Sequence, residues 1–354
     1  GATDEAYIAD IYYAASAQIV AKAAAVLGLE ETRQNYQAIA DRQWQVVKEE
    51  YFTATGRCAV KTQTGLVLAL KYHLSDNERL TEQMLRKLLR DNKNKLNTGF
   101  VGTPLLCNVL TEHGMTDLAY RLLLNEEYPG WLHEVKLGAT TVWERWNSLD
   151  ENGRISSTGM NSLNHYSYGA VLEWIFRHVA GIDVTEQGPG GKMMRISPKV
   201  DHKLGSASAV YDSASGCYRC GWQIENGDQI TVTVTVPFGA KAQVILPYAP
   251  DSVYHDTDNP LFETVENGIC CVKAGQYTVT YKAASPLKKS YSVDSTLEDL
   301  LGEPAIRAFL SNMMEVDMIP DLAYGLTLRQ AAEAFAGGVS AEQAQRLNVL
   351  LEEF

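Results

Sequence analysis

A glutamate placed between two tryptophans is the arrangement in this sequence with the clearest chemical potential. The segment reads Trp143-Glu144-Arg145-Trp146, and Trp131 lies shortly upstream of it. An indole face stacks on the C–H face of a pyranose ring, and a nearby carboxylate can activate water or bind sugar hydroxyls. Apolar surroundings also raise the pKa of a carboxylate towards neutral pH. These residue types at this spacing indicate a site for carbohydrate chemistry.

The same residues also fit a purely structural interpretation. Trp143 and Trp146 would then be core residues, and Glu144 would pair with Arg145 or Lys136. Clusters of aromatic and acidic side chains are common in packed loops, so composition alone favours this second interpretation.

The elements that must position these residues begin with a helical region. Helical periodicity predicts helices over about 5–27, 31–51, 62–73, 76–90, 103–114, 116–127 and 165–180. The short connections between them are typical of stacked αα-hairpins. The one long interruption, 128–163, holds three of the six tryptophans. Long loops on a helical scaffold often carry function, so we expect the site there.

The pattern changes to strands after about residue 188. Residues 229–236 alternate with period two and follow an Asn226-Gly227 turn signal, which predicts a strand. Similar runs up to about 281 predict an antiparallel β-sandwich. Short helices return from 293 to 354 and form a small helical tail.

Four spacings of the capping-box type predict helix starts. They are Ser75 with Glu78, Ser295 with Glu298, Thr327 with Gln330, and Ser340 with Gln343.

Composition and charge exclude several classes of protein. The 354 residues are 45% hydrophobic and 21% charged, as in ordinary globular proteins and unlike disordered chains. The net charge of −12 argues against nucleic acid or an anionic membrane as a partner. No apolar run is long enough to span a membrane, and no leader is recognisable, so a cytoplasmic location is expected.

The six cysteines raise the question of a zinc site. Cys217 and Cys220 form a CxxC pair, and Cys270 and Cys271 are adjacent. In strands, residues three apart or next to each other face opposite sides of the sheet, so the four thiolates cannot converge. We expect reduced thiols and no metal or other cofactor.

Three strings taken together resemble the bacterial α-L-rhamnosidases. They are TGFVGTPLL (Thr98–Leu106), GATTVWERW (Gly138–Trp146) and MNSLNHYSYGAVLEW (Met160–Trp174). The resemblance covers about 6–281 and implies an inverting glycoside hydrolase with an (α/α)6 barrel followed by a β-sandwich. The expected fold is therefore α+β and multidomain. Its parts would be the C-terminal half of the barrel (1–187), the sandwich (188–285) and a helical tail outside the resemblance (293–354).

The resemblance also implies roles for single residues. Glu144 corresponds to the general base, and His165 to a sugar-binding histidine, although from the sequence alone His165 is better explained as a helix cap. Trp131, Trp143 and Trp146 would line or support the site. Arg145 is also assigned to substrate binding, although orienting neighbouring acceptors is its more natural task.

The chain departs from the family pattern in one important respect. An inverting hydrolase needs a second carboxylic acid, and the acidic segment that supplies it in the family has no counterpart here. The resemblance thus implies a C-terminal fragment that exposes an apolar seam. We expect this fragment to self-associate, to pair with the missing half of the barrel, or to close its helices in a different arrangement. If the chain alone hydrolysed rhamnosides, it would have to contain the second carboxylic acid, and Glu134 would be the first candidate to test. A helical-barrel glycosidase for another sugar and a non-catalytic carbohydrate-binding module remain alternatives.

Overall fold

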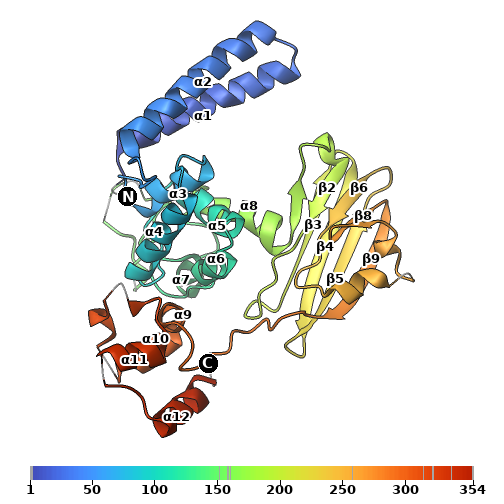
Figure 1. Cartoon of the computed structure of the whole chain (residues 1–354). Helices are drawn as coiled ribbons and strands as arrows, with labels where there is room; N and C mark the ends of the chain where they lie inside the picture. The colour runs from blue at the N-terminus through green and yellow to red at the C-terminus, as the bar shows by residue number, and fades with distance from the viewer. Residues whose placement is uncertain are drawn as a thin grey trace. The chain divides into compact units, whose positions relative to one another are not determined.

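The computed structural model describes residues 3–150, 152–157, 159, 161–256, 258–313, 315–320, 323–335 and 337–352. Met160, the first residue of one of the three strings, lies outside the described residues. The chain forms two compact units, Gly1–Ala283 and Ala284–Phe354. Figure 1 shows the order of the elements along the chain.

The first unit begins with a long antiparallel hairpin of two helices. These are α1 (Glu5–Val26) and α2 (Glu30–Tyr51), as the periodicity predicts. Asp4 caps α1 by accepting from Tyr7 N–H at 3.0 Å, and Gly28 turns the chain with a φ of 70°. The buried Tyr7 hydroxyl donates to Gly65 O at 3.0 Å, which joins the hairpin to the following helix.

Four further helices precede the long interruption. They are α3 (Gln63–Lys71), α4 (Glu78–Asp91), α5 (Thr103–Glu112) and α6 (Thr116–Leu123). Every residue of 63–70 is buried, including the apolar run Leu66–Leu70. The predicted cap of α4 is wrong, because the Ser75 hydroxyl donates to Gly56 O at 2.6 Å. Asn77 caps α4 instead by accepting from Leu80 N–H at 3.1 Å.

The interruption contains a short helix that the sequence analysis did not predict. This helix is α7 (Trp131–Lys136), which carries Glu134. The helix predicted over 165–180 is present from Tyr168 to Val179 as a 3-10 turn, one α-turn and a π-turn. The three parts of this segment are η1 (Tyr168–Ala170), α8 (Val171–Trp174) and η2 (Ile175–Val179). The Trp174 indole N–H donates to Thr111 Oγ1 at 2.8 Å and anchors this segment on α5.

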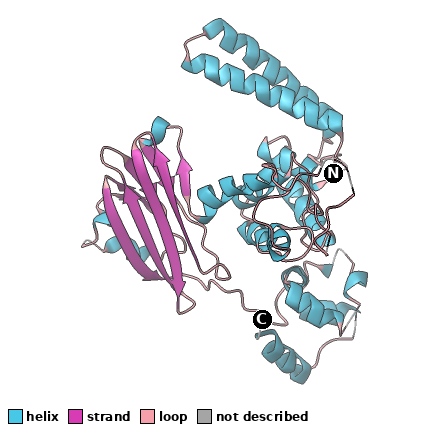
Figure 2. Ribbon diagram, turned by 180° about the vertical axis from the view of Figure 1, so that it is seen from behind, coloured by secondary structure: helices cyan, strands magenta, loops and turns pink. Residues whose placement is uncertain are grey.

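Two sheets follow, and Figure 2 shows their strands in magenta. The first sheet has the order β1-β2-β6-β8-β7, and the second β3-β4-β5-β9. The strands are β1 (Ile182–Val184), β2 (Met193–Ile196), β3 (Ser206–Ser213), β4 (Gly216–Glu225), β5 (Gln229–Val236), β6 (Lys241–Val244), β7 (Val265–Glu266), β8 (Ile269–Val272) and β9 (Gly275–Lys282). Short 3-10 turns occur at η3 (Pro189–Gly191), η4 (Asp251–His255) and η5 (Pro260–Phe262).

The predicted antiparallel pairing holds for all of these strand pairs except β2 with β6, which are parallel. The second sheet buries alternate residues of β4 and β5, as a period-two pattern requires. Tyr218 on β4 reaches the first sheet, where its hydroxyl donates to Lys241 O on β6 at 3.0 Å. On β4, Cys220 is buried with Tyr218, whereas Cys217 belongs to the opposite, partly exposed face.

The second unit is a small helical tail with a hydrophobic core of its own. Its elements are α9 (Leu297–Gly302), α10 (Pro304–Ser311), η6 (Val316–Met318), α11 (Leu328–Phe335) and α12 (Ala341–Glu352). Residues from all five, including Leu300, Ile306 and Leu351, form this core. A single antiparallel bridge between Thr296 and Thr327 joins the starts of α9 and α11.

The capping boxes of the tail are confirmed at two of three positions. Thr327 pairs reciprocally with Gln330, and Ser340 with Gln343. The third lies one residue later than predicted, with Thr296 accepting from Asp299 N–H at 3.2 Å. Within the described residues, no helix combines the length and apolar character that a membrane span requires.

Candidate active site

The segment that contains Glu144 is held against a second segment from the end of the same long interruption. Glu144 N–H donates to Ser162 O at 2.9 Å, and His165 N–H donates to Val142 O at 2.8 Å. These backbone hydrogen bonds place Glu144 and His165 on two neighbouring segments without regular secondary structure. The structure thus brings together the two strings in which the proposed base and the proposed sugar-binding histidine occur.

The Glu144 carboxylate is fixed by one of these neighbours. Ser162 N–H donates to Glu144 Oε2 at 2.8 Å, and the residue is 7% exposed. Lys136, a partner in the structural interpretation, forms its ion pair with Glu126. A carboxylate held through Oε2 by a backbone amide has a defined orientation and keeps Oε1 available as a proton acceptor.

The turn after Glu144 is closed by a serine. Arg145 N–H donates to Ser148 Oγ at 3.2 Å, and Ser148 N–H donates back to Arg145 O at 3.0 Å. Asn161 adds a bond from its Nδ2 to Ser148 O at 3.0 Å. The Arg145 side chain is exposed, in contrast to its neighbours on both sides. The backbone around Glu144 is therefore tied down on both sides of the carboxylate.

Glu134 supports the same turn from α7. This helix ends at Lys136, and Gly138, two residues later, has a φ of 85° that suits the left-handed position after a helix. Trp143 N–H donates to Glu134 Oε2 at 3.3 Å. Glu134 is 3% exposed, and burial raises the pKa of its carboxyl to about 7, against the opposing effect of the Trp143 N–H. Its Oε1 is buried and has no hydrogen-bond partner.

The three tryptophans of the site are buried and pack on each other or on the turn. The Trp146 ring stacks on Tyr168 with centroids 4.0 Å apart and lies edge-on to Trp131 at 5.4 Å. Trp131 Nε1 donates to Tyr168 O at 2.9 Å, which joins α7 to η1. The exposed fraction of Trp143 is 2%. In this arrangement the indoles support the turn, and direct stacking on a sugar stays a prediction.

His165 accepts a backbone hydrogen bond just before the segment that begins at Tyr168, and its sugar-binding role stays a prediction. Ser167 N–H donates to His165 Nδ1 at 3.3 Å, whereas the segment itself begins at Tyr168 without a side-chain cap. A neutral ring with Nδ1 as acceptor carries its proton on Nε2, which is then a donor for a ligand oxygen. Phe100 stacks on His165 with centroids 5.1 Å apart.

Phe100 is a candidate binding residue that the sequence analysis missed. It is 45% exposed, belongs to the Thr98–Leu106 string and also contacts Tyr168 edge-on at 5.5 Å. The only signal for it was membership of that string, because an isolated phenylalanine has no distinguishing pattern. Phe100 and His165 together form an aromatic surface beside the turn that carries Glu144.

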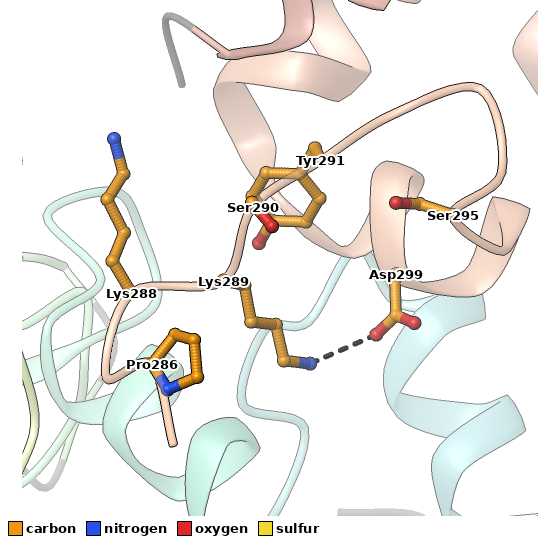
Figure 3. A pocket seen from close by; sticks show the side chains of 7 residues that line it. All are labelled: Pro286, Lys288, Lys289, Ser290, Tyr291, Ser295 and Asp299. Carbon is orange, nitrogen blue, oxygen red and sulfur yellow. Dashed lines mark hydrogen bonds and ion pairs between the residues drawn. The ribbon is translucent and has the colours of Figure 1, made fainter. Parts of the chain in front are cut away.

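A shallow pocket in the second unit has different chemistry. Its lining comprises Pro286, Lys288, Lys289, Ser290, Tyr291, Ser295 and Asp299 (Figure 3). The one carboxylate in this lining, Asp299, pairs with Lys289 at 3.0 Å. The pocket lacks the pair of carboxyl groups that glycoside hydrolysis uses. In the part of the chain that the structure describes, no group of three or more His, Cys, Asp or Glu residues is arranged to hold a metal ion.

Comparison with known proteins gives two family matches. Residues 1–179 match the bacterial alpha-L-rhamnosidase 6 hairpin glycosidase domain, and residues 181–259 match the bacterial alpha-L-rhamnosidase C-terminal domain. The chain is 36% identical over 270 residues to an alpha-L-rhamnosidase of Formosa agariphila, covering 75% of this chain and 29% of that protein. It is also 36% identical over 283 residues to one of Alteromonas sp. (strain LOR), covering 78% of this chain and 30% of that protein.

Solved structures show the same relationship. The alpha-L-rhamnosidase of Streptomyces avermitilis complexed with L-rhamnose superposes with a TM-score of 0.70 at 32% identity, covering 78% of this chain and 27% of that one. The enzyme from Aspergillus terreus gives 0.69 at 28% identity, covering 80% of this chain and 31% of that one. The chain thus spans about three-tenths of the length of these relatives. It belongs to the bacterial α-L-rhamnosidase family of six-hairpin glycosidases.

Proposed function

We propose that the protein to which this chain belongs hydrolyses terminal α-L-rhamnosides with inversion, and that Glu144 is its general base. The observation that carries this proposal is the carboxylate of Glu144, nearly buried and oriented by Ser162 N–H at 2.8 Å. Family membership and the structural relative complexed with L-rhamnose support the choice of sugar.

The proposed reaction follows from the orientation of this carboxylate. Glu144 Oε1 takes a proton from water as the water oxygen attacks the anomeric carbon from the face opposite the leaving group. A second carboxylic acid gives its proton to the glycosidic oxygen, and the bond from that oxygen to the anomeric carbon breaks. His165 Nε2 would donate to a sugar hydroxyl, while Trp131, Trp143, Trp146 and Arg145 support the turn and the binding surface.

We place the acid in a part of the protein outside these residues. The chain spans 29% and 30% of the length of two curated relatives, which supports a shared barrel of which this chain is one portion. The test is hydrolysis of p-nitrophenyl α-L-rhamnoside by the chain alone and by the chain joined to the upstream region of its gene. Activity only in the joined form is expected. Activity of the chain alone would overturn the placement of the acid, and no activity with either would overturn the function.

Phe100→Ala is expected to weaken substrate binding more than turnover. Loss of an aromatic contact of about 1 kcal/mol corresponds to a rise in KM of about fivefold with little change in kcat. Steady-state kinetics of the active form measures both values. Tyr166→Ala is the matched control, because Tyr166 is a more exposed ring that also stacks on His165. Equal effects of the two variants would remove Phe100 from the binding surface.

We also propose that α1 and α2 pack against further helices of the barrel. Large apolar side chains are exposed on this hairpin, including Tyr13, Ile19, Val26, Leu27 and Leu29. The chain alone is therefore expected to bind a hydrophobic dye and to sediment above its monomer mass. Ile19→Lys with Leu27→Lys should reduce both signals. A concentration-independent monomer without dye binding would contradict this packing.

A further inference from the structure

Glu134 is a buried acid with one oxygen engaged and one unpaired. Its Oε2 accepts from Trp143 N–H at 3.3 Å, directly before Glu144 in the chain. Its Oε1 is buried without a hydrogen-bond partner. A buried carboxyl with an unpaired oxygen is unfavourable for stability, particularly when it is charged, so it calls for an explanation in function.

The burial of Oε1 excludes one explanation. A general acid must reach the glycosidic oxygen, and Oε1 is closed to solvent in this structure. Glu134 is therefore placed to influence the reaction only through the atoms it contacts. The contact that leads to the proposed base is the hydrogen bond from Trp143 N–H.

We propose that Glu134 is a positioning residue for Glu144: the hydrogen bond that it accepts from Trp143 N–H fixes the backbone directly before Glu144. Protonation of Glu134 weakens this hydrogen bond. The inference rests on the proposed role of Glu144. An ionised carboxylate accepts a stronger hydrogen bond from an amide than a neutral carboxyl does. The backbone before Glu144 is thus held more firmly when Glu134 is charged. Because burial raises the pKa of Glu134 to about 7, the change falls near neutral pH.

Titratable groups lie near Glu134 on η1, in the turn and on α7 itself. On η1, burial raises the pKa of Tyr168, the charge of Glu134 raises it further, and Arg145 in the turn lowers it. Tyr128, before α7, also raises the Tyr168 pKa. On α7 itself lie His133 and Lys136, and Lys136 pairs with Glu126. The pKa of Glu134 is governed by burial and, in the opposite direction, by Trp143 N–H.

The hydrogen bond can be observed directly by NMR. Labelling with [15N]tryptophan gives one backbone amide signal for each of the six tryptophans, and Trp143→Phe identifies the relevant one. We expect the Trp143 amide proton to move downfield as pH rises, with a midpoint near 7. In Glu134→Gln this movement should be absent, whereas His133→Gln should retain it. A Trp143 signal that ignores pH, or that titrates equally in Glu134→Gln, would overturn the proposal.

Hydrogen exchange tests the hold on Glu144. Glu134→Leu removes the acceptor, and peptides covering 142–148 and 161–165 should then exchange faster. Glu126→Gln, which alters an exposed glutamate near α7, is the matched control and should not change them. If Glu134→Leu does not fold, Glu134→Gln across the pH range gives the comparison. Unchanged exchange at both segments in a folded variant would also overturn the proposal.

Kinetics separates this inference from the proposed function. In the active form of the protein, Glu134→Gln should lower kcat by up to about 10²-fold with little change in KM, and should remove a pH dependence near 7. If no form hydrolyses rhamnosides, the proposed function fails, while the amide titration and exchange still report on Glu134. If activity is present and its pH profile is the same in Glu134→Gln, the inference alone fails.

Discussion

Glu144→Gln is expected to reduce kcat by about 10²- to 10⁴-fold, because an amide cannot accept the proton of the attacking water. The substitution keeps the shape of the side chain and an oxygen for Ser162 N–H, whose bond to Oε2 is 2.8 Å long. Affinity for L-rhamnose should therefore change little. The measurement is kcat and KM on p-nitrophenyl α-L-rhamnoside, together with calorimetric titration of L-rhamnose.

The control for this substitution is Glu173→Gln on α8, an exposed glutamate whose partner is Arg177. It should leave kcat unchanged. An equal loss in both variants would point to general destabilisation. Full activity of Glu144→Gln would mean that another group deprotonates water. Azide supplies a nucleophile that needs no base, so recovery of turnover with azide would identify the missing function as that of the base.

Glu134→Gln is expected to stabilise the first unit at alkaline pH and to have little effect in acid. Burial raises the pKa of Glu134 from 4.5 to about 7. The folded protein thus keeps this proton while the unfolded chain releases it, and the free energy of unfolding falls as pH rises from 4.5 to about 7. Above that range the free energy of unfolding is about 3 kcal/mol lower than it is in acid. The glutamine variant has no charge to bury and escapes this loss.

Urea unfolding at about pH 5 and about pH 9 measures this difference. All six tryptophans lie in Gly1–Ala283, so their fluorescence follows this unit alone. Glu126→Gln is again the control and should show the same pH dependence as the unchanged protein, because Glu126 is exposed. A stability difference between Glu134→Gln and the unchanged protein that is equal at both pH values would show that Glu134 does not titrate in this range.

The sequence predicts the long elements well because their patterns extend over many residues. The helices α1 and α2 and the strand β5 each follow one period for eight residues or more. The short helix α7, with six residues, is too brief for a period to be detected. Helix starts were predicted less accurately, since Asn77 and Thr296 cap where Ser75 and Ser295 were expected. Adjacent polar residues offer similar hydroxyl or amide oxygens, and packing decides which one is used.

The site could be located from the sequence but not assembled from it. The resemblance points to Glu144 and His165, and the structure places both on segments joined by backbone hydrogen bonds. The bond from Trp143 to Glu134 depends on where α7 lies, which no local pattern encodes. The stacking of Phe100 on His165 likewise joins residues far apart in the chain. Their assigned roles in binding and catalysis stay predictions.

The separate core of the helical tail has a consequence for how the chain unfolds. Leu300, Ile306, Leu351 and their neighbours form a hydrophobic core within the second unit. Two cores of different size and composition have different heat capacities of unfolding and different midpoints. A calorimetric scan should therefore resolve into two endotherms, of which only the larger coincides with the change in tryptophan emission. We therefore expect the chain to unfold as two thermodynamic domains.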